Sequence, residues 1–212
     1  MQDTDAIFLS FKLALYTLAI MLPLGIWLAH CLVRMGPVKP WLEALLALPL
    51  VLPPTVLGYY LLVGFGDTTL FGYPLVFSFG GILLASLIVN LPFAVQPIQR
   101  AFESINPEIR EAAEVSGLSP WQTFRLIELP LAWRGVTSAA VMTFAHTLGE
   151  FGVILMVGGA IPGETKTVSI AIYDKVQSFD IAGAGLLSLL LLSTSLIAIA
   201  LSYGVFGRRK SC

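Results

Sequence analysis

The sequence predicts an all-α polytopic membrane protein with five transmembrane helices and one polar cytoplasmic loop. Of its 212 residues, 57% are hydrophobic and only 12% are charged, a composition far from that of soluble domains. Five apolar runs are long enough to cross a bilayer, which takes about 20 helical residues. These runs are Ile7–Val33, Trp41–Gly64, Phe79–Ile98, Val136–Val157 and Ile181–Phe206. We therefore expect residues 1–212 to form a single transmembrane domain.

The first three runs differ in the signals that they carry. The first follows Asp3 and Asp5 instead of a basic cluster and is too long for a signal peptide, so we expect it to remain in the mature protein. The second contains LPLVLPPTVLG (Leu48–Gly58), whose three prolines favour either a kinked helix or a broken helix beside a pathway. The third places Asn90 two residues before Pro92, which adds a polar group at a similar break.

The fourth run carries the polar groups from which we expect a gate or a pathway. His146 and Glu150 are four residues apart, a spacing that places them on one face of a helix. An uncompensated carboxylate at mid-membrane costs about 2.5 to 3.5 kcal/mol, so Glu150 should face a cavity or a partner. It is either a buried acceptor bonded to His146 or backbone groups, or part of a gate. The gate or pathway candidates are Asn90, Thr143, His146, Thr147, Gly149, Glu150 and Gly152.

The basic residues define the orientation of the chain. Nine of the twelve Lys and Arg residues fall on the side of the polar loop and the C-terminus, whereas only Lys12, Lys166 and Lys175 fall on the other. The nine are Arg34, Lys39, Arg100, Arg110, Arg125, Arg134, Arg208, Arg209 and Lys210. The positive-inside rule therefore places the polar loop and the C-terminus in the cytoplasm and the N-terminus outside.

Two connections are expected on the outer side. Residues 66–78 form a short loop without Lys or Arg, and residues 158–180 form a longer one. The longer connection contains VSIAIYDKV (Val168–Val176), which is suited to a short helix at the interface or over an outer vestibule. An external partner or solute would arrive at these loops.

Catalytic and metal-binding motifs are missing from the sequence. It has no GxxxxGK[ST] loop, no GxSxG elbow and no HExxH pair, and one His with one Glu does not make a metal ligand set. Cys31 and Cys212 have no paired spacing, so we interpret them as free thiols without a role. We expect no enzymatic activity, metal or cofactor in this chain. Two other classes stay open: a membrane enzyme with His146 and Glu150 as an acid–base pair, and a carrier driven by protons through Glu150.

The polar loop, residues 105–130, predicts two short helices. Asn106 is a capping residue and Pro107 opens the first helix, which Gly117 then stops. Ser119 caps the second helix at Pro120, and Pro130 ends or kinks it before the next span. Small residues leave the first helix a closely approachable surface. The loop is therefore either an ordinary solvated connector or a helix that docks into a cleft of another protein.

The spacing within this loop resembles the EAA loop of ATP-binding-cassette (ABC) importer permeases. The fixed positions of that pattern are Glu111, Ala112, Ala113, Gly117, Ile127, Leu129 and Pro130. The stretch LGEFGVILMVGGAIPGETKTVSIAIY (Leu148–Tyr173) resembles the molybdate importer permeases, and the five-span layout is similar to theirs. The resemblance covers nearly the whole chain and implies the type I importer permease fold, with molybdate or tungstate as substrate and sulfate or another oxyanion as the alternative.

The resemblance also implies partners. The helix containing Glu111 to Ser116 would sit in a groove of a cytoplasmic ATPase subunit, present as a homodimer, which binds the ATP. A second copy of this chain would complete the path in the lipid of the cytoplasmic (inner) membrane of a prokaryote, and a periplasmic or extracellular oxyanion-binding protein would deliver the substrate. No nucleic acid is implied. The polar groups that the spans offer to a tetrahedral dianion are Thr55, Ser86, Thr137, Thr143 and Thr147.

Overall fold

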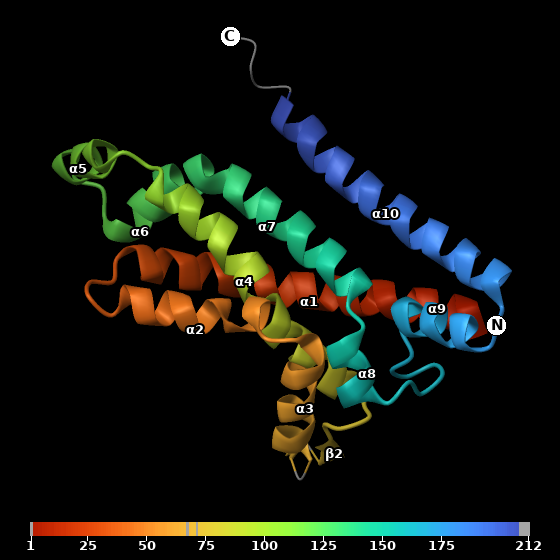
Figure 1. Cartoon of the computed structure of the whole chain (residues 1–212). Helices are drawn as coiled ribbons and strands as arrows, with labels where there is room; N and C mark the ends of the chain where they lie inside the picture. Colours follow the sequence, from red (N-terminus) through yellow and green to blue (C-terminus); the bar gives the residue numbers. More distant parts are fainter. Residues whose placement is uncertain (1, 67, 71, 208–212) are drawn as a thin grey trace.

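The computed structural model of the chain describes residues 2–66, 68–70 and 72–207, and it is helical apart from one two-residue strand pair (Figure 1). The helices are α1 (Gln2–Val33), α2 (Lys39–Val51), α3 (Pro54–Phe65), α4 (Phe79–Glu103), α5 (Pro107–Val115), α6 (Pro120–Thr123), η1 (Phe124–Glu128), α7 (Leu129–Gly149), α8 (Gly152–Gly158), α9 (Val168–Gln177) and α10 (Ile181–Gly207). Strands β1 (Thr69–Leu70) and β2 (Tyr73–Pro74) pair antiparallel in the connection between α3 and α4. The predicted basic residues Arg208, Arg209 and Lys210, and Cys212, lie outside the described residues.

Three of the expected spans are single helices and two are broken. By length and composition α1, α4 and α10 can each cross a membrane, and α1 continues through Pro23. Of the two alternatives for the second span, the structure has the broken helix: α2 and α3 meet at an angle of 106° at Leu52 and Pro53. The fourth is α7 followed by α8 at 59°. The chain therefore has up to five spans, if each bent pair counts as one.

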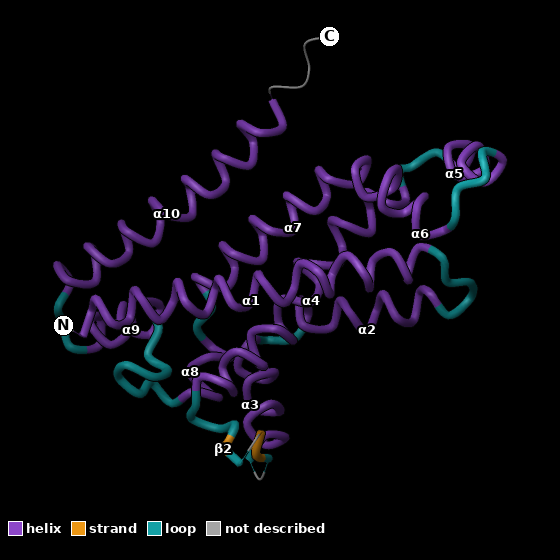
Figure 2. The backbone as a smooth tube through the Cα atoms, turned by 180° about the vertical axis from the view of Figure 1, so that it is seen from behind, coloured by secondary structure: helices purple, strands orange, loops and turns teal. Residues whose placement is uncertain are grey.

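A bundle of α1, α4 and α7 forms the centre of the molecule, and α2 lies alongside it (Figures 1 and 2). At the end of the bundle near α5 the core includes Ala29, Val95, Ile98, Phe102 and Ala132. Small residues allow the closest approach of α4 and α7. A Cβ atom added at Gly135 would lie 2.5 Å from the Cβ of Ala101 and 2.6 Å from the carbonyl oxygen of Pro97. The two helix backbones are thus in near contact at this glycine.

We expect Gly135→Ala to destabilise the chain. The added methyl group meets backbone that cannot rotate away, and overpacking of this kind costs about 1–3 kcal/mol. The midpoint of thermal unfolding in detergent should fall by about 2–12 °C. Gly185→Ala in α10 is the matched control, because nothing lies within 4 Å of the added methyl group. Equal midpoints for the two variants would contradict the close approach of α4 and α7.

The opposite end of the molecule is organised around α9, which confirms the short helix expected at residues 168–176. Val168 and Ala171 of α9 pack against Ala6 of α1 and Leu187 of α10. The amide of Gly183 and the Lys175 ammonium hold the pKa of Asp180 below its usual range. Beyond this joint α10 diverges from the bundle (Figures 1 and 2), and its leucines are largely exposed. This helix therefore presents a long apolar face to its surroundings.

The polar loop folds as its capping residues predict. The side chain of Asn106 accepts a hydrogen bond from the amide of Glu108 at 3.0 Å, and Ser119 forms a capping box with Gln122. Gly117 adopts a φ of +79°, a left-handed conformation that ends α5 at little cost only for glycine. Pro130 does not end a helix but lies in the first turn of α7, after the π-helical turn η1.

Candidate functional site

The first part of the site is α5, which protrudes at the end of the molecule opposite α9 (Figure 1). Glu111 and Ala112 are exposed on it, and Val115 is 90% exposed although it is apolar. Ala113, by contrast, is only 3% exposed and lies on the inner side of the helix. The exposed surface of α5 therefore includes Glu111, Ala112 and Val115, whereas Ala113 packs against the rest of the chain.

The other positions of the EAA pattern shape the loop. The amide of Leu118 bonds the carbonyl of Ala113 at 3.1 Å around Gly117, which fixes the end of α5. Ile127 and Leu129 are half-buried, Leu129 against the core of the bundle, and Pro130 is exposed. The pattern thus combines an exposed helix face with residues that hold the helix in place.

The second part of the site is a pocket of about 490 Å³ where the two broken spans meet. In both views α3 and α8 lie side by side (Figures 1 and 2). A Cβ atom added at Gly152 would lie 3.0 Å from the Cβ of Pro54, so the first turn of α8 touches the first turn of α3. The lining comprises Pro49, Leu50, Leu52, Pro54, Thr55, Leu57, Val89, Phe93, His146, Gly149, Glu150, Phe151, Gly152 and Val153.

A chain of hydrogen bonds links the predicted pathway residues across α4 and α7. His146 Nδ1 lies 3.2 Å from Asn90 Oδ1, and the Asn90 amide donates to the backbone carbonyl of Ser86 at 2.8 Å. The hydroxyl of Ser86 donates to Glu150 Oε2 at 2.9 Å. The ring of His146 also stacks on that of Phe93, with centroids 4.1 Å apart. The structure therefore joins Asn90, His146 and Glu150 into one network.

Two expectations for this region need correction. His146 and Glu150 do not share a helix face, because α7 ends at Gly149 and Glu150 has an extended backbone with a ψ of 125°. Glu150 is bonded to Ser86 and not to His146, and its Oε1 has no partner among the described residues. Thr143 and Thr147 are buried and are not among the lining residues of this pocket, and Thr147 donates to the carbonyl of Thr143 at 2.7 Å, so their place in a pathway stays a prediction. The helix break separates what the four-residue spacing placed together.

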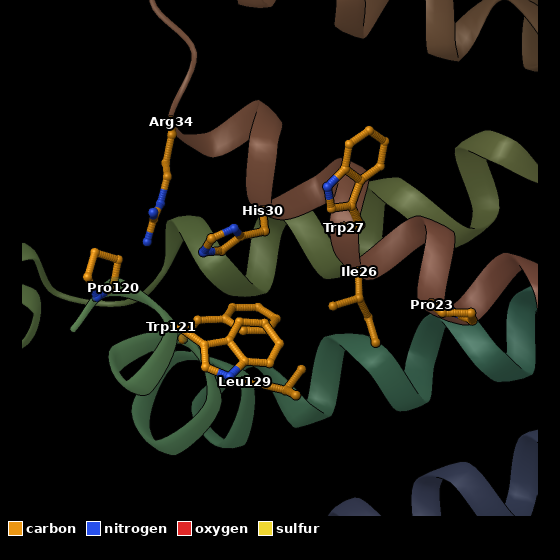
Figure 3. A pocket seen from close by; sticks show the side chains of 9 residues that line it. Pro23, Ile26, Trp27, His30, Arg34, Pro120, Trp121 and Leu129 are labelled. Carbon is orange, nitrogen blue, oxygen red and sulfur yellow. The ribbon is translucent and has the colours of Figure 1, made fainter. Parts of the chain in front are cut away.

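The sequence reasoning missed one group near the loop. Glu128 lies inside the EAA pattern, between the fixed positions Ile127 and Leu129. It is fully buried, and its carboxylate contacts three basic side chains. The sequence does contain a signal for this group, because Glu128 is a single carboxylate in the otherwise apolar run Leu126–Pro130. Beside it, a largely apolar groove of about 510 Å³ runs between α1 and the segment from α6 to α7, with His30 and Arg34 at one end (Figure 3).

Several known proteins are similar in sequence to this chain over most of its length. The chain is 44% identical over 195 residues to the Molybdenum transport system permease protein ModB of Azotobacter vinelandii, which covers 86% of this chain and 85% of the relative. Identity to ModB of Escherichia coli K12 is 36%, over 94% of this chain and 92% of the relative. The Probable sulfate transport system permease protein cysT of Chlorella vulgaris is 32% identical, over 77% of this chain and 64% of the relative.

Solved structures share the fold. A chain of a bacterial ABC transporter involved in the import of the acidic polysaccharide alginate superposes with a TM-score of 0.76 at 21% identity, over 100% of this chain and 81% of that chain. A chain of the MetNI methionine ABC transporter in an inward facing conformation gives 0.72 at 18% identity, over 96% of this chain and 92% of that chain.

A family description matches residues 21–211, from the middle of α1 to the end of α10 and beyond. It spans α5 and the pocket between the broken spans alike. The chain belongs to the family of binding-protein-dependent transport system inner membrane components.

Proposed function

We propose that this chain is the membrane permease subunit of an ATP-driven importer for molybdate or tungstate. The observation that carries the proposal is the exposed face of α5, an apolar and acidic helix surface held outside the spans, in a chain whose relatives at 36–44% identity are molybdenum transport permeases. The sulfate permease relative supports sulfate as the alternative substrate. ATP is bound by a separate ATPase subunit, and this chain performs no catalysis.

The partners follow from the same proposal. A dimer of ATPase subunits binds α5 on the cytoplasmic side, and a periplasmic binding protein delivers the oxyanion to the connections around residues 66–78 and 158–180. The exposed leucines of α10 face lipid or a second copy of this chain. The N-terminus lies outside and the C-terminus in the cytoplasm, in the orientation that the basic residues favour.

The pocket at the broken spans is the proposed passage for the anion. Its polar side chains are the hydroxyl of Thr55, the imidazole of His146 and the carboxylate of Glu150, and no Lys or Arg is among its lining residues. A dianion can be held by hydroxyl and imidazole groups without a full positive charge, and it is then released easily. The charge of Glu150 opposes an anion, but its carboxylate is held by Ser86 on one side of the pocket. We propose that Glu150 and His146 orient the gate and do not bind the substrate.

The test is uptake of labelled molybdate by cells that lack their own high-affinity importer. The cells express this chain together with the ATPase and the binding protein that neighbouring genes encode, and each of the three components is omitted in turn. Uptake that needs all three, and that tungstate but not excess sulfate blocks, is expected. Competition by sulfate would move the substrate to the alternative. Uptake that persists without the ATPase and collapses with the proton gradient would instead make the chain a proton-coupled carrier.

A further inference from the structure

The inference concerns Glu128, the buried carboxylate between α5 and the bundle. Its Oε1 accepts a hydrogen bond from Arg110 Nε at 2.6 Å. Its Oε2 lies 2.9 Å from His30 Nε2 and 3.3 Å from Arg34 Nη2. A carboxylate with this degree of burial is strongly destabilising unless it is paired and hydrogen-bonded, so the three basic groups are a requirement of its position.

The partners of Glu128 come from different parts of the fold. Arg110 belongs to α5, His30 to α1, and Arg34 follows the end of α1. Arg110 also donates from Nη2 to the backbone carbonyl of Phe102 in α4, at 2.9 Å. One carboxylate and one guanidinium therefore connect α5 with the cytoplasmic ends of α1 and α4 and with the turn that begins α7.

This connection is the main polar attachment of α5. In the part of the chain that the structure describes, no other side chain of α5 makes a hydrogen bond or ion pair to α1, α4 or α7. His30 itself is held in place, because its ring lies edge-on to Phe102 and Phe124 with centroids 5.6 and 4.6 Å away. Arg110 and Glu128 therefore give α5 a charged contact with α1 that does not run through the backbone of the loop.

We propose that Glu128 is a positioning residue that fastens α5 to α1 and α4, so that movement of α5 is transmitted to these spans. The inference rests on the proposed function, in which an ATPase subunit moves α5. The Arg110–Glu128 pair is well suited to this role, because a charge-assisted hydrogen bond from a guanidinium is strong and has a fixed geometry.

Glu128→Gln tests the proposal, because the amide keeps the volume of the side chain but removes its charge and turns donors toward Arg110 or His30. In the reconstituted complex with ATPase and binding protein, we expect molybdate uptake per ATP hydrolysed to fall about tenfold, while the ATPase subunit stays bound and active. Glu103→Gln is the matched control. Glu103 also pairs with basic groups at this end, with Lys39 at 2.7 Å and Arg100 at 3.0 Å, but it does not touch α5.

A second measurement does not depend on transport. Hydrogen exchange of the α5 amides should be at least fivefold faster in the Glu128→Gln complex than in the wild type, and unchanged in Glu103→Gln. If Glu128→Gln does not fold, Arg110→Gln removes the same pair from the loop side, where the arginine side chain is 29% exposed. A wild-type ratio of uptake to ATP hydrolysis, or unchanged exchange of α5, overturns the proposal. A wild-type complex without ATP-dependent uptake overturns the proposed function instead, and the exchange data still decide whether Glu128 fastens α5.

Discussion

Val115→Asp is expected to reduce ATP-dependent uptake to background and to release the ATPase subunit from the membrane complex. Val115 is 90% exposed on α5, where an apolar side chain gains nothing from water. In a groove of the ATPase a carboxylate at this position would lose its hydration without a partner. A penalty of about 3 kcal/mol would already weaken binding more than a hundredfold. Co-purification of the ATPase with the permease and uptake in intact cells measure the two effects.

Val38→Asp is the control for this substitution. Val38 is 58% exposed in the connection between α1 and α2 on the same side of the membrane, but it is not part of α5. The control should retain both the ATPase and uptake. If Val115→Asp behaves like Val38→Asp, the exposed face of α5 is an ordinary solvated surface, which is the alternative that the sequence left open.

The sequence predicts the loop better than it predicts the spans. The hydrogen bonds around Asn106, Gly117 and Ser119 join residues two to five positions apart, so local capping rules suffice to place α5 and α6. The π-helical turn before Pro130 was not foreseen. Proline lacks an amide hydrogen, and the adjacent amide of Leu129 bonds the carbonyl of Phe124 five residues back. Such a shift depends on how the following helix packs.

The pocket was also predicted only in part, because its geometry depends on how the helices pack. Asn90, His146 and Glu150 were recognised because polar groups in apolar runs are costly, a rule that needs no structure. Their pairing could not be predicted, because a break at Gly149 turns Glu150 toward Ser86 of another helix. Hydropathy also treats residues 41–64 as one run, because it measures the polarity of the side chains and does not detect a change in the direction of the helix axis. Glu128 was missed because its partners are 18 to 98 residues away in sequence.

Thr55→Asp is expected to lower molybdate uptake at least a hundredfold. Thr55 lines the pocket in the first turn of α3, and it is exposed. A carboxylate about 6 Å from a passing dianion would repel it by about 5 kcal/mol at an effective dielectric constant of about 20. The fold should tolerate the substitution, because a negative charge in the first turn of a helix is favourable. Uptake and ATP hydrolysis are measured in the same reconstituted complex.

Thr55→Asn separates charge from shape, because asparagine has nearly the same size as aspartate and is neutral. It should retain uptake within about a factor of three, and equal losses in the two variants would mean that the anion does not pass this pocket.

Glu150→Gln completes the comparison. Its amide oxygen can still accept the hydrogen bond from Ser86, so an ATP-driven permease should keep its uptake. A proton-coupled carrier would lose it, because glutamine cannot exchange the proton that drives transport. The combined result, loss in Thr55→Asp with uptake preserved in both neutral variants, is expected only if the anion passes close to Thr55 and transport is driven from α5.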